Sequence, residues 1–237
     1  MKILALEASA AAASCALLED DRLLGENFLN LPQTHSQTLM PMAQRLLETA
    51  GVSAREMDLI AVSAGPGSFT GLRIAMAAAK GMAFPGDTPC AGVSTLEALA
   101  YNLPALEGAV LPAMDARCGQ VYAAMFDLAE GRPRRLIADS ALAVRDLEPW
   151  LQNLTKPVFL VGDGAQLCYN ILLKDYPFLK LASAHLRFQL AASVGLLALR
   201  EARAGRTVSA RELVPSYLRL PQAERELLQK QAKQQKK

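Results

Sequence analysis

The sequence predicts an α/β protein made of two related halves, each a mixed sheet with flanking helices. Apolar runs with strand character alternate with helical patterns along the chain. The run from Val110 to Asp115 repeats the pattern of the run from Ile3 to Glu7, and each ends in a carboxylate. This weak internal repeat indicates two similar units of roughly one hundred residues each. We place them at residues 1–107 and 108–220, followed by a flexible basic tail at 221–237.

The composition is typical of a globular cytoplasmic protein. Of the 237 residues, 51% are hydrophobic. The apolar runs break within about 10 residues, whereas a membrane-spanning helix needs ~20. The N-terminus enters a strand-like run directly, without the pattern of a secretory signal peptide. We therefore expect a cytoplasmic location and no membrane contact.

Charge is nearly balanced except at the C-terminal end. The formal net charge is +2, and the tail contains five basic residues against two acidic ones, which leaves the remaining chain slightly negative. Nonspecific affinity for nucleic acid depends on many phosphate contacts, so a near-neutral body is a poor binder. The simplest interpretation of the tail is a solvated helix end, and contact with RNA or a protein partner is the alternative.

Cysteine and histidine are too few and too scattered for a metal centre. His35 and His185 cannot form an H-x-x-x-H or H-E-x-x-H pair, and no G-x-S-x-G nucleophile motif is present. We therefore expect neither zinc hydrolysis nor a Ser-His-Asp triad, and we interpret His35 as a polar residue at a helix start. The cysteines form no C-x-x-C pair and are predicted to be small buried residues. They are Cys15, Cys90, Cys118 and Cys168.

In the first half, strands are expected at residues 2–7, 14–18, 22–28, 58–63 and 89–93. Helices are expected at residues 34–51, 68–83 and 94–102. Thr34 is a candidate N-cap for the first of these helices, with Gln37 at the capping-box position. Pro41 must either kink that helix or lie in its first turn, where a missing N–H matters little.

In the second half, strands are expected at residues 110–115, 119–127, 134–138 and 158–161, with a turn at 129–133. Helices are expected at residues 144–152, 165–174 and 187–204. The last helix is apolar on nearly every face, so we expect it to be buried, to pack back on the first half and to stop at Gly205. Residues 215–220 are expected to form an ordered connector.

A glycine-rich stretch, Ser63-Ala-Gly65-Pro-Gly67-Ser68-Phe-Thr-Gly71-Leu-Arg73, joins a strand to the next helix. It is not a Walker A loop, because no lysine follows the last glycine. The acidic residue expected at the end of the next strand of a dinucleotide site is also absent. We favour glycines that allow a tight turn and close helix packing. Anion binding at the helix N-terminus, by Gly65, Gly67 and Ser68, is the alternative.

The helix after this stretch is thin and apolar around much of its circumference. Small residues permit close contact between helices, and the helix before Gly51 is also rich in Met and Leu. The two helices are therefore predicted to form an interaction surface, and the alternative is that both merely cover the sheet. The candidate interface residues are Leu39, Met42, Ala43, Leu46, Gly71, Leu72, Ala75, Ala78, Ala79 and Met82.

Two carboxylates and a second glycine turn are the remaining candidates for chemistry. Glu7 and Asp115 end the repeated strands, where a carboxylate can hold Mg²⁺ near a phosphate. Gly162 and Gly164 lie in a turn after a buried strand, where a nucleoside could bind. The plainer interpretation, which we favour for the carboxylates, is hydrogen bonding to neighbouring turns.

The repeated strand-hairpin-strand unit, together with the turn from Gly162 to Ala165, resembles the actin-like ATPase and sugar-kinase superfamily (ASKHA fold), which has two RNase H-like halves. A closer resemblance, from the first strand to about Leu220, is to the TsaB (YeaZ) family. The motifs that carry it are Gly65-Pro-Gly-Ser-Phe-Thr-Gly-Leu-Arg-Ile74, His35-Ser36 with Leu39 and Pro41, Asp115-Ala-Arg117 with Gly119, Val121 and Tyr122, and Pro215-Ser-Tyr217-Leu-Arg219.

This resemblance implies a subunit of the bacterial machinery that places a threonylcarbamoyl group on the adenosine beside the anticodon of certain tRNAs. In that family the catalytic, metal-binding chain is the paralogue TsaD, and TsaE supplies ATPase activity. The resemblance implies a non-catalytic chain that dimerises with TsaD, self-associates in isolation, meets tRNA only through the complex and requires no cofactor of its own.

One departure bears on nucleotide binding. The family's first strand usually ends in Asp-Thr-Ser-Thr or a similar sequence, whereas this chain has Glu7-Ala8-Ser9-Ala10. The change removes the aspartate and both threonine hydroxyls of the first phosphate segment, which argues against autonomous binding of ATP or ADP with Mg²⁺. The alternative function is a stand-alone ATP-dependent phosphotransferase of the same fold, with Glu7 and Asp115 around Mg²⁺.

Overall fold

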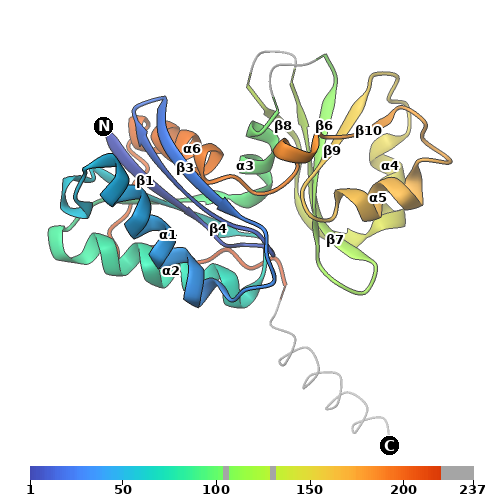
Figure 1. The fold of residues 1–237 in the computed structure, drawn as a ribbon. Coiled ribbons are helices and arrows are strands. Elements are labelled where there is room, and N and C mark those ends of the chain that lie inside the picture. The colour runs from blue at the N-terminus through green and yellow to red at the C-terminus, as the bar shows by residue number, and fades with distance from the viewer. Residues whose placement is uncertain (104–106, 129–131, 220–237) are drawn as a thin grey trace, which may run out of the picture.

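The computed structural model describes residues 1–103, 107–128 and 132–219. The predicted tail and most of the predicted turn at 129–133 lie outside the described residues. The chain forms two sheets, one in each half, with helices on their faces (Figure 1). Within the described ranges, no helix is both long enough and apolar enough to span a membrane.

The first sheet has the strand order β3-β2-β1-β4-β5. β2 is antiparallel to β1 and β3, whereas β4 is parallel to β1 and β5, so the sheet is mixed. β1 is central and its side chains are buried on both faces, which explains why its sequence is a continuous apolar run. The strands are β1 (Lys2–Glu7), β2 (Ala13–Glu19), β3 (Arg22–Leu29), β4 (Leu59–Gly65) and β5 (Cys90–Ser94).

Three helices cover the first sheet. α1 (His35–Ala50) and α2 (Phe69–Ala83) lie side by side on one face, and α6 (Ala191–Arg203) lies on the other (Figure 1). The short 3-10 turns η1 (Ala54–Glu56) and η2 (Phe84–Gly86) follow α1 and α2. The face under α1 and α2 buries Leu4 and Leu6, and the face under α6 buries Ile3. Each such fully buried side chain stabilises the fold by about 1.5–3 kcal/mol.

The second sheet repeats the topology of the first. Its order, β10-β9-β6-β7-β8, places β6 at the centre, with an antiparallel pair on one side and parallel strands on the other. The predicted internal repeat and two-sheet α/β class are therefore confirmed. The strands are β6 (Ala109–Asp115), β7 (Gln120–Asp127), β8 (Arg134–Ala143), β9 (Val158–Val161) and β10 (Leu179–Leu181). The three-residue β10 was not predicted, because so short a strand carries no periodic signal.

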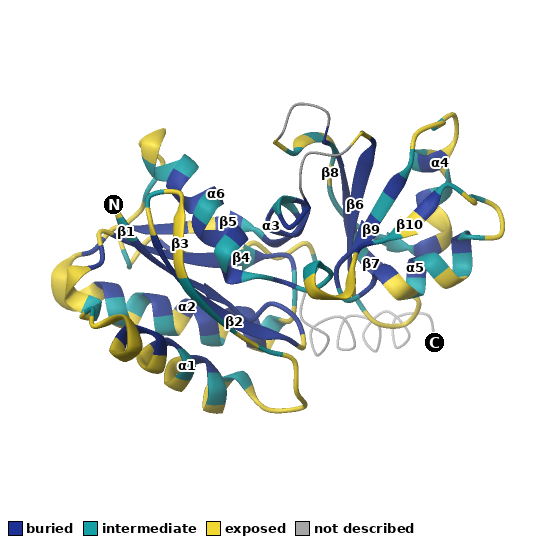
Figure 2. Cartoon of the chain, turned by 45° about the horizontal axis from the view of Figure 1, so that its top comes forward, coloured by how far each residue is buried: buried dark blue, intermediate teal, exposed yellow. Residues whose placement is uncertain are grey.

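The remaining helices cover the second sheet and the junction of the halves. η3 (Val144–Leu147), α4 (Glu148–Leu151) and α5 (Ala165–Leu172) pack on one face of the second sheet. α3 (Thr95–Tyr101) lies between the two halves (Figures 1 and 2) and packs Leu96 and Leu99 against Val110 and Phe126 on the other face. The two halves therefore share a continuous apolar contact through α3.

α1 differs from its prediction at its N-terminal end. Thr34 is the N-cap residue, but its side chain makes no capping hydrogen bond. Pro41 lies in the second turn of the helix rather than in the first. Its ring removes the N–H that would otherwise bond to the carbonyl of Gln37.

α6 starts at Ala191 rather than at residue 187, and its first N–H groups are capped by distant side chains. Ser14 Oγ accepts the Ala191 N–H and Glu26 Oε1 accepts the Ala192 N–H, both at 2.9 Å. The preceding residues Ala184–Leu186 form a 3-10 turn, η4. Gly205 follows the helix with a φ of 70°, as expected for a helix stop.

Three smaller predictions are corrected. The predicted helix at 144–152 divides into η3 and α4, and the strand predicted at 134–138 extends to Ala143. Three of the cysteines are buried as predicted, but Cys118 is exposed. Cys118 lies in the tight turn between β6 and β7, with a φ of 54°.

Candidate functional site

The glycine-rich stretch between β4 and α2 is packed tightly against two other backbone segments, residues 8–9 and Ser216. A Cβ added to Gly71 would clash with the carbonyl oxygen of Ala8, and one added to Gly65 would clash with the carbonyl oxygen of Ser216. A Cβ on Gly67 would come within 2.5 Å of the carbonyl oxygen of Ser9. Gly65 also has a φ of 125°, which favours glycine. These contacts support the packing interpretation of the motif.

Two N–H groups at the start of α2, those of Ser68 and Gly71, have acceptors within the chain. Ser68 Oγ accepts the Gly71 N–H at 3.3 Å, as an N-cap does, and Ser68 N–H donates to the carbonyl of Ser9 at 2.6 Å. The segment from Ala8 to Ser9 thus packs directly against this helix end. The geometry favours packing over anion binding at Gly65, Gly67 and Ser68.

Glu7 is buried and hydrogen-bonded inside the first half. Its carboxylate accepts the Ser9 N–H at 2.5 Å and the hydroxyl of Ser63. Burial raises the pKa of Glu7, and the hydrogen bonds from Ser63 and Ser9 oppose that rise. His35 is nearby and places Nε2 2.7 Å from the carbonyl of Ala10. Glu7 therefore fixes the turn after β1.

We expect Glu7→Gln to change how stability depends on pH. Because the folded pKa of Glu7 is raised, the unfolded chain releases this proton first as the pH rises above about 4.3, and the folded chain loses stability until Glu7 also ionises in the folded state. The amide cannot ionise and can still hydrogen-bond Ser63. The variant should therefore match the wild type near pH 4 and exceed it in unfolding free energy at pH 7.

Urea unfolding of both proteins between pH 4 and pH 8 measures this difference. The buried Glu26 and Asp163, whose pKa values are also raised by burial, titrate in both proteins and cancel in the comparison. A constant difference across this range would show that Glu7 does not titrate as described.

Asp115 lies in a different environment from Glu7. It is partly exposed, accepts the Arg117 N–H at 2.8 Å and lies 3.6 Å from the Arg117 guanidinium. Gly162 and Gly164 allow the turn after β9 to approach the end of β6, because a Cβ on either would contact Ala113 or Asp115 backbone atoms. Each predicted carboxylate is thus paired inside its own half, as the plainer interpretation predicts.

One polar pair in this region was missed by sequence reasoning. Asp163, in the predicted turn, accepts a hydrogen bond from Gln189 Nε2 at 2.8 Å, and burial raises the Asp163 pKa. The carbonyl of Gln189 in turn accepts the hydroxyl of Ser14. The sequence predicted the turn that contains Asp163, but no sequence pattern connects it with Gln189. Across the described parts of the chain, no group of three or more His, Cys, Asp or Glu side chains is placed to hold a metal ion.

Many of the predicted interface residues lie on the sides of α1 and α2 that face the sheet, and not on their exposed sides. Figure 2 shows α1 and α2 with buried residues toward the sheet and exposed residues away from it. The prediction is wrong for the residues that pack into the core of the same chain, because they are not accessible to a partner. These are Leu39, Ala43, Leu46, Gly71, Leu72, Ala75 and Ala79.

Met42, Ala78 and Met82 are half-buried and keep part of their surface accessible. On α2, Ile74, Ala78 and Met82 follow one another at four-residue spacing and so lie on one face. We call the residues Met40, Gln44, Ile74, Ala77, Ala78, Gly81 and Met82 the outer face of α1 and α2.

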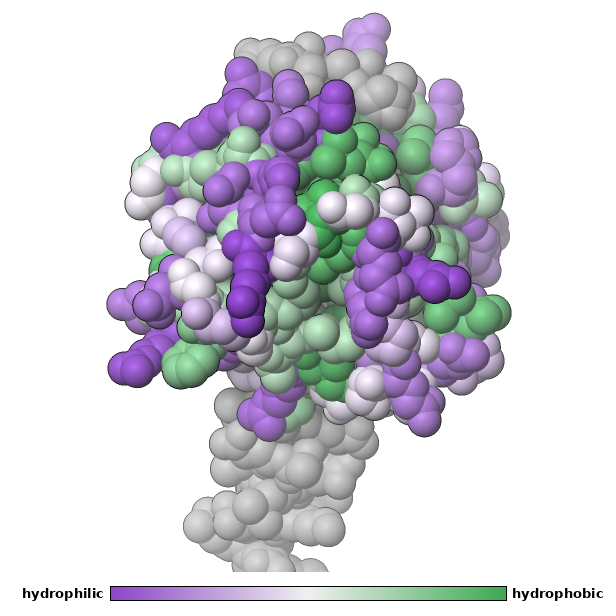
Figure 3. Space-filling model, turned by 60° about the vertical axis from the view of Figure 1, so that its left-hand side comes forward, coloured by the Kyte–Doolittle hydropathy of each residue, from purple (hydrophilic) through white to green (hydrophobic). Residues whose placement is uncertain are grey.

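A cavity of about 560 Å³ opens at the C-terminal end of this outer face. It brings Met40 and Gln44 of α1 together with Met82 of α2. Apolar side chains gather between hydrophilic margins on this side of the molecule (Figure 3). The lining residues are Met40, Gln44, Leu47, Glu48, Gly51, Val52, Ser53, Ala54 and Met82.

The chain is 32% identical over 98% of its length, and 100% of the relative's, to the tRNA threonylcarbamoyladenosine biosynthesis protein TsaB of Bacillus subtilis. It is 33% identical to the Escherichia coli protein of the same name, over 92% of this chain and 95% of the other. The chain belongs to the TsaB (YeaZ) family.

A family match and a solved structure agree with membership of this chain in the TsaB family. Residues 30–232 match the family described as TsaD, tRNA N6-adenosine threonylcarbamoyltransferase. The solved structure of YeaZ from Pseudomonas aeruginosa is similar at 31% identity and a TM-score of 0.74, covering 92% of this chain and 99% of that one. The family and the fold class predicted from the sequence motifs are therefore confirmed.

Proposed function

We propose that this chain is a non-catalytic partner subunit in the threonylcarbamoylation of tRNA. It binds a TsaD-type chain and supports transfer of the threonylcarbamoyl group to N6 of the adenosine beside the anticodon. The observation that carries the proposal is the full-length similarity to proteins named tRNA threonylcarbamoyladenosine biosynthesis protein TsaB. The match to the TsaD family supports a pair of chains with related folds.

The assignment of a non-catalytic role is supported by how the candidate carboxylates are used. Glu7 is buried and accepts hydrogen bonds from Ser9 and Ser63, and Asp115 is paired with Arg117. Both carboxylates therefore stabilise turns of their own halves. An arrangement for phosphoryl transfer would instead direct them at a shared Mg²⁺ and a phosphate.

The outer face of α1 and α2 is the proposed contact surface for the TsaD-type chain. Alanine and glycine at positions 77, 78 and 81 allow a partner helix to approach closely, and Met40 and Met82 provide adaptable apolar contact. In isolation the same face would pair with a second copy. TsaE and tRNA would join through the assembled complex, in the cytoplasm.

A titration with Mg-ATP distinguishes this role from a phosphotransferase. We expect the isolated chain to bind Mg-ATP no more tightly than about 1 mM and to hydrolyse none, since the backbone of Ser9 packs against the start of α2 and the Ser68 hydroxyl caps it. Isothermal calorimetry and a phosphate-release assay measure both. Turnover, or micromolar binding lost in both Glu7→Gln and Asp115→Asn, would favour the phosphotransferase.

A further inference from the structure

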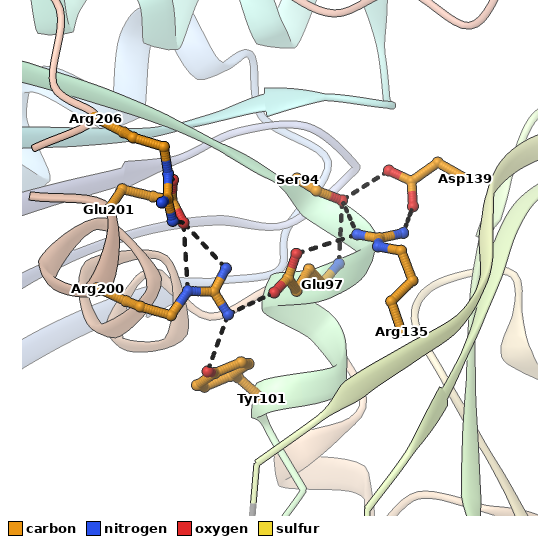
Figure 4. A network of polar contacts seen from close by, with 8 residues as sticks. All are labelled: Ser94, Glu97, Tyr101, Arg135, Asp139, Arg200, Glu201 and Arg206. Atoms are coloured by element: carbon orange, nitrogen blue, oxygen red, sulfur yellow. Dashed lines mark hydrogen bonds and ion pairs between the residues drawn. The ribbon is translucent and has the colours of Figure 1, made fainter. Parts of the chain in front are cut away.

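A network of charged side chains crosses the junction between the two halves (Figure 4). Arg135, from β8 of the second half, contacts Glu97 of α3 at 3.1 Å and forms an ion pair with Asp139. Asp139 also accepts the hydroxyl of Ser94, the N-cap residue of α3, at 2.7 Å. Two residues of β8 are thus joined to the first turn of α3.

Glu97 is shared between two arginines. Its Oε2 faces Arg135, and its Oε1 lies 2.8 Å from the guanidinium of Arg200 on α6. Arg200 also contacts Glu201, which pairs in turn with Arg206 at 2.6 Å. Figure 4 shows Glu97 between the two guanidinium groups, so a strand of the second half and a helix packed on the first sheet meet at one carboxylate.

The central groups are removed from most of the solvent. The side chains of Glu97, Asp139 and Arg135 are 17%, 19% and 31% exposed, and the Arg135 guanidinium lies 4.5 Å from the centre of the Phe126 ring. Ion pairs in such partly buried positions are screened less by salt than surface pairs. Charge-assisted hydrogen bonds are also directional, whereas the apolar contact of α3 with β6 and β7 is not.

A second set of contacts joins the halves through the C-terminal segment. Ser216 N–H donates to the carbonyl of Ala64 at the end of β4, at 2.7 Å. Arg219, three residues later, donates to Gln120 and to the carbonyl of Ala116, beside the turn between β6 and β7. The halves are therefore tied by polar contacts at two separate places, around an apolar contact that alone would permit sliding.

We propose that the network centred on Glu97 and Arg135 is a clamp that fixes the angle between the two halves of the free chain. Glu97 accepts from both sides, and neither arginine can move without leaving a partly buried carboxylate short of a partner. This inference concerns the isolated chain and stands whether or not the proposed function is correct.

Pulsed electron–electron double resonance, which measures the distance between two spin labels, tests the clamp. One label is attached to the exposed Cys118 of the second half and the other to Arg45→Cys on α1, where the arginine side chain is 80% exposed. The labelled chain is diluted with unlabelled chain so that only distances within one molecule contribute. We expect a single narrow distance distribution before any further substitution.

Arg135→Met removes the charge and keeps an aliphatic side chain over Phe126, and it should widen the distribution roughly twofold or more. Arg134→Ala is the matched control, because that arginine is 62% exposed and pairs with Asp127 in its own sheet. The control should leave the distribution unchanged. An unchanged width in folded Arg135→Met would overturn the proposal. If that variant does not fold, Asp139→Asn, which keeps the contact with Ser94, is held to the same criterion.

Discussion

Gly71→Ala is expected to lower the free energy of unfolding by about 3 kcal/mol or more, or to prevent folding. The added Cβ would overlap the backbone carbonyl oxygen of Ala8, and it would also come within 3.3 Å of the His35 ring. A backbone carbonyl cannot rotate away as a flexible side chain can. Relief would require α2 to move off the sheet, which would expose Leu72 and Ala75 of the core.

Gly81→Ala, in the same helix, is the control for Gly71→Ala. Gly81 is exposed and a Cβ there would meet no atom within 4 Å. Because alanine favours the helix over glycine by up to about 1 kcal/mol, this variant should be as stable as the wild type or more stable. Chemical denaturation followed by circular dichroism measures both variants. Equal stability of the two would show that the close approach of α2 to residue 8 is not required.

Ala78→Glu is expected to weaken pairing with a TsaD-type chain by about 100-fold or more. A glutamate there would place a bulky charged group between helices that approach closely through small residues. Ala78 is half-buried at the surface of α2, so the charge can reach solvent in the free chain and the monomer should fold. Ala75 is unsuitable for this test, because it is 1% exposed and lies in the core.

Ala138→Glu on β8 is the matched control for Ala78→Glu. Ala138 is an exposed alanine and lies in the other half of the chain. Affinity measured by surface plasmon resonance against an immobilised TsaD-type chain should be lost with Ala78→Glu and retained with Ala138→Glu. Full affinity of Ala78→Glu would place the contact elsewhere on the molecule.

The central strands and the internal repeat could be predicted because their signal is local. β1 and β6 are buried on both faces and therefore appear as continuous apolar runs, each followed by a hairpin. The similarity of Ile3 to Glu7 with Val110 to Asp115 was enough to predict two matching sheets. β10 and the divided helix at 144–151 have no comparable signal.

The accessible face of α2 could not be assigned from sequence. Gly71, Ala75 and Ala79 are small and lie on the buried side of α2. Ala77 and Ala78 are equally small and lie on its accessible side. Periodicity identifies a face only when polar and apolar residues alternate with the helical repeat. Which side of α2 is accessible depends on where the sheet lies, and that is known only from the fold.

Contacts between residues far apart in the sequence also could not be predicted from sequence patterns. Ser14 and Glu26 cap a helix that begins at Ala191, and Glu97 pairs with Arg135 and Arg200. No spacing rule connects these positions, because each pair forms only when separate elements pack together. The glycine motif indicated close packing, but the residues it packs against, Ala8 and Ser216, emerged only from the fold.

Co-expression of this chain with a TsaD-type chain, followed by size-exclusion chromatography with light scattering, tests the central claim most directly. The account predicts that the two chains elute together as a complex with one copy of each, and that Ala78→Glu separates them while Ala138→Glu does not. Elution of two folded chains as separate species would contradict it.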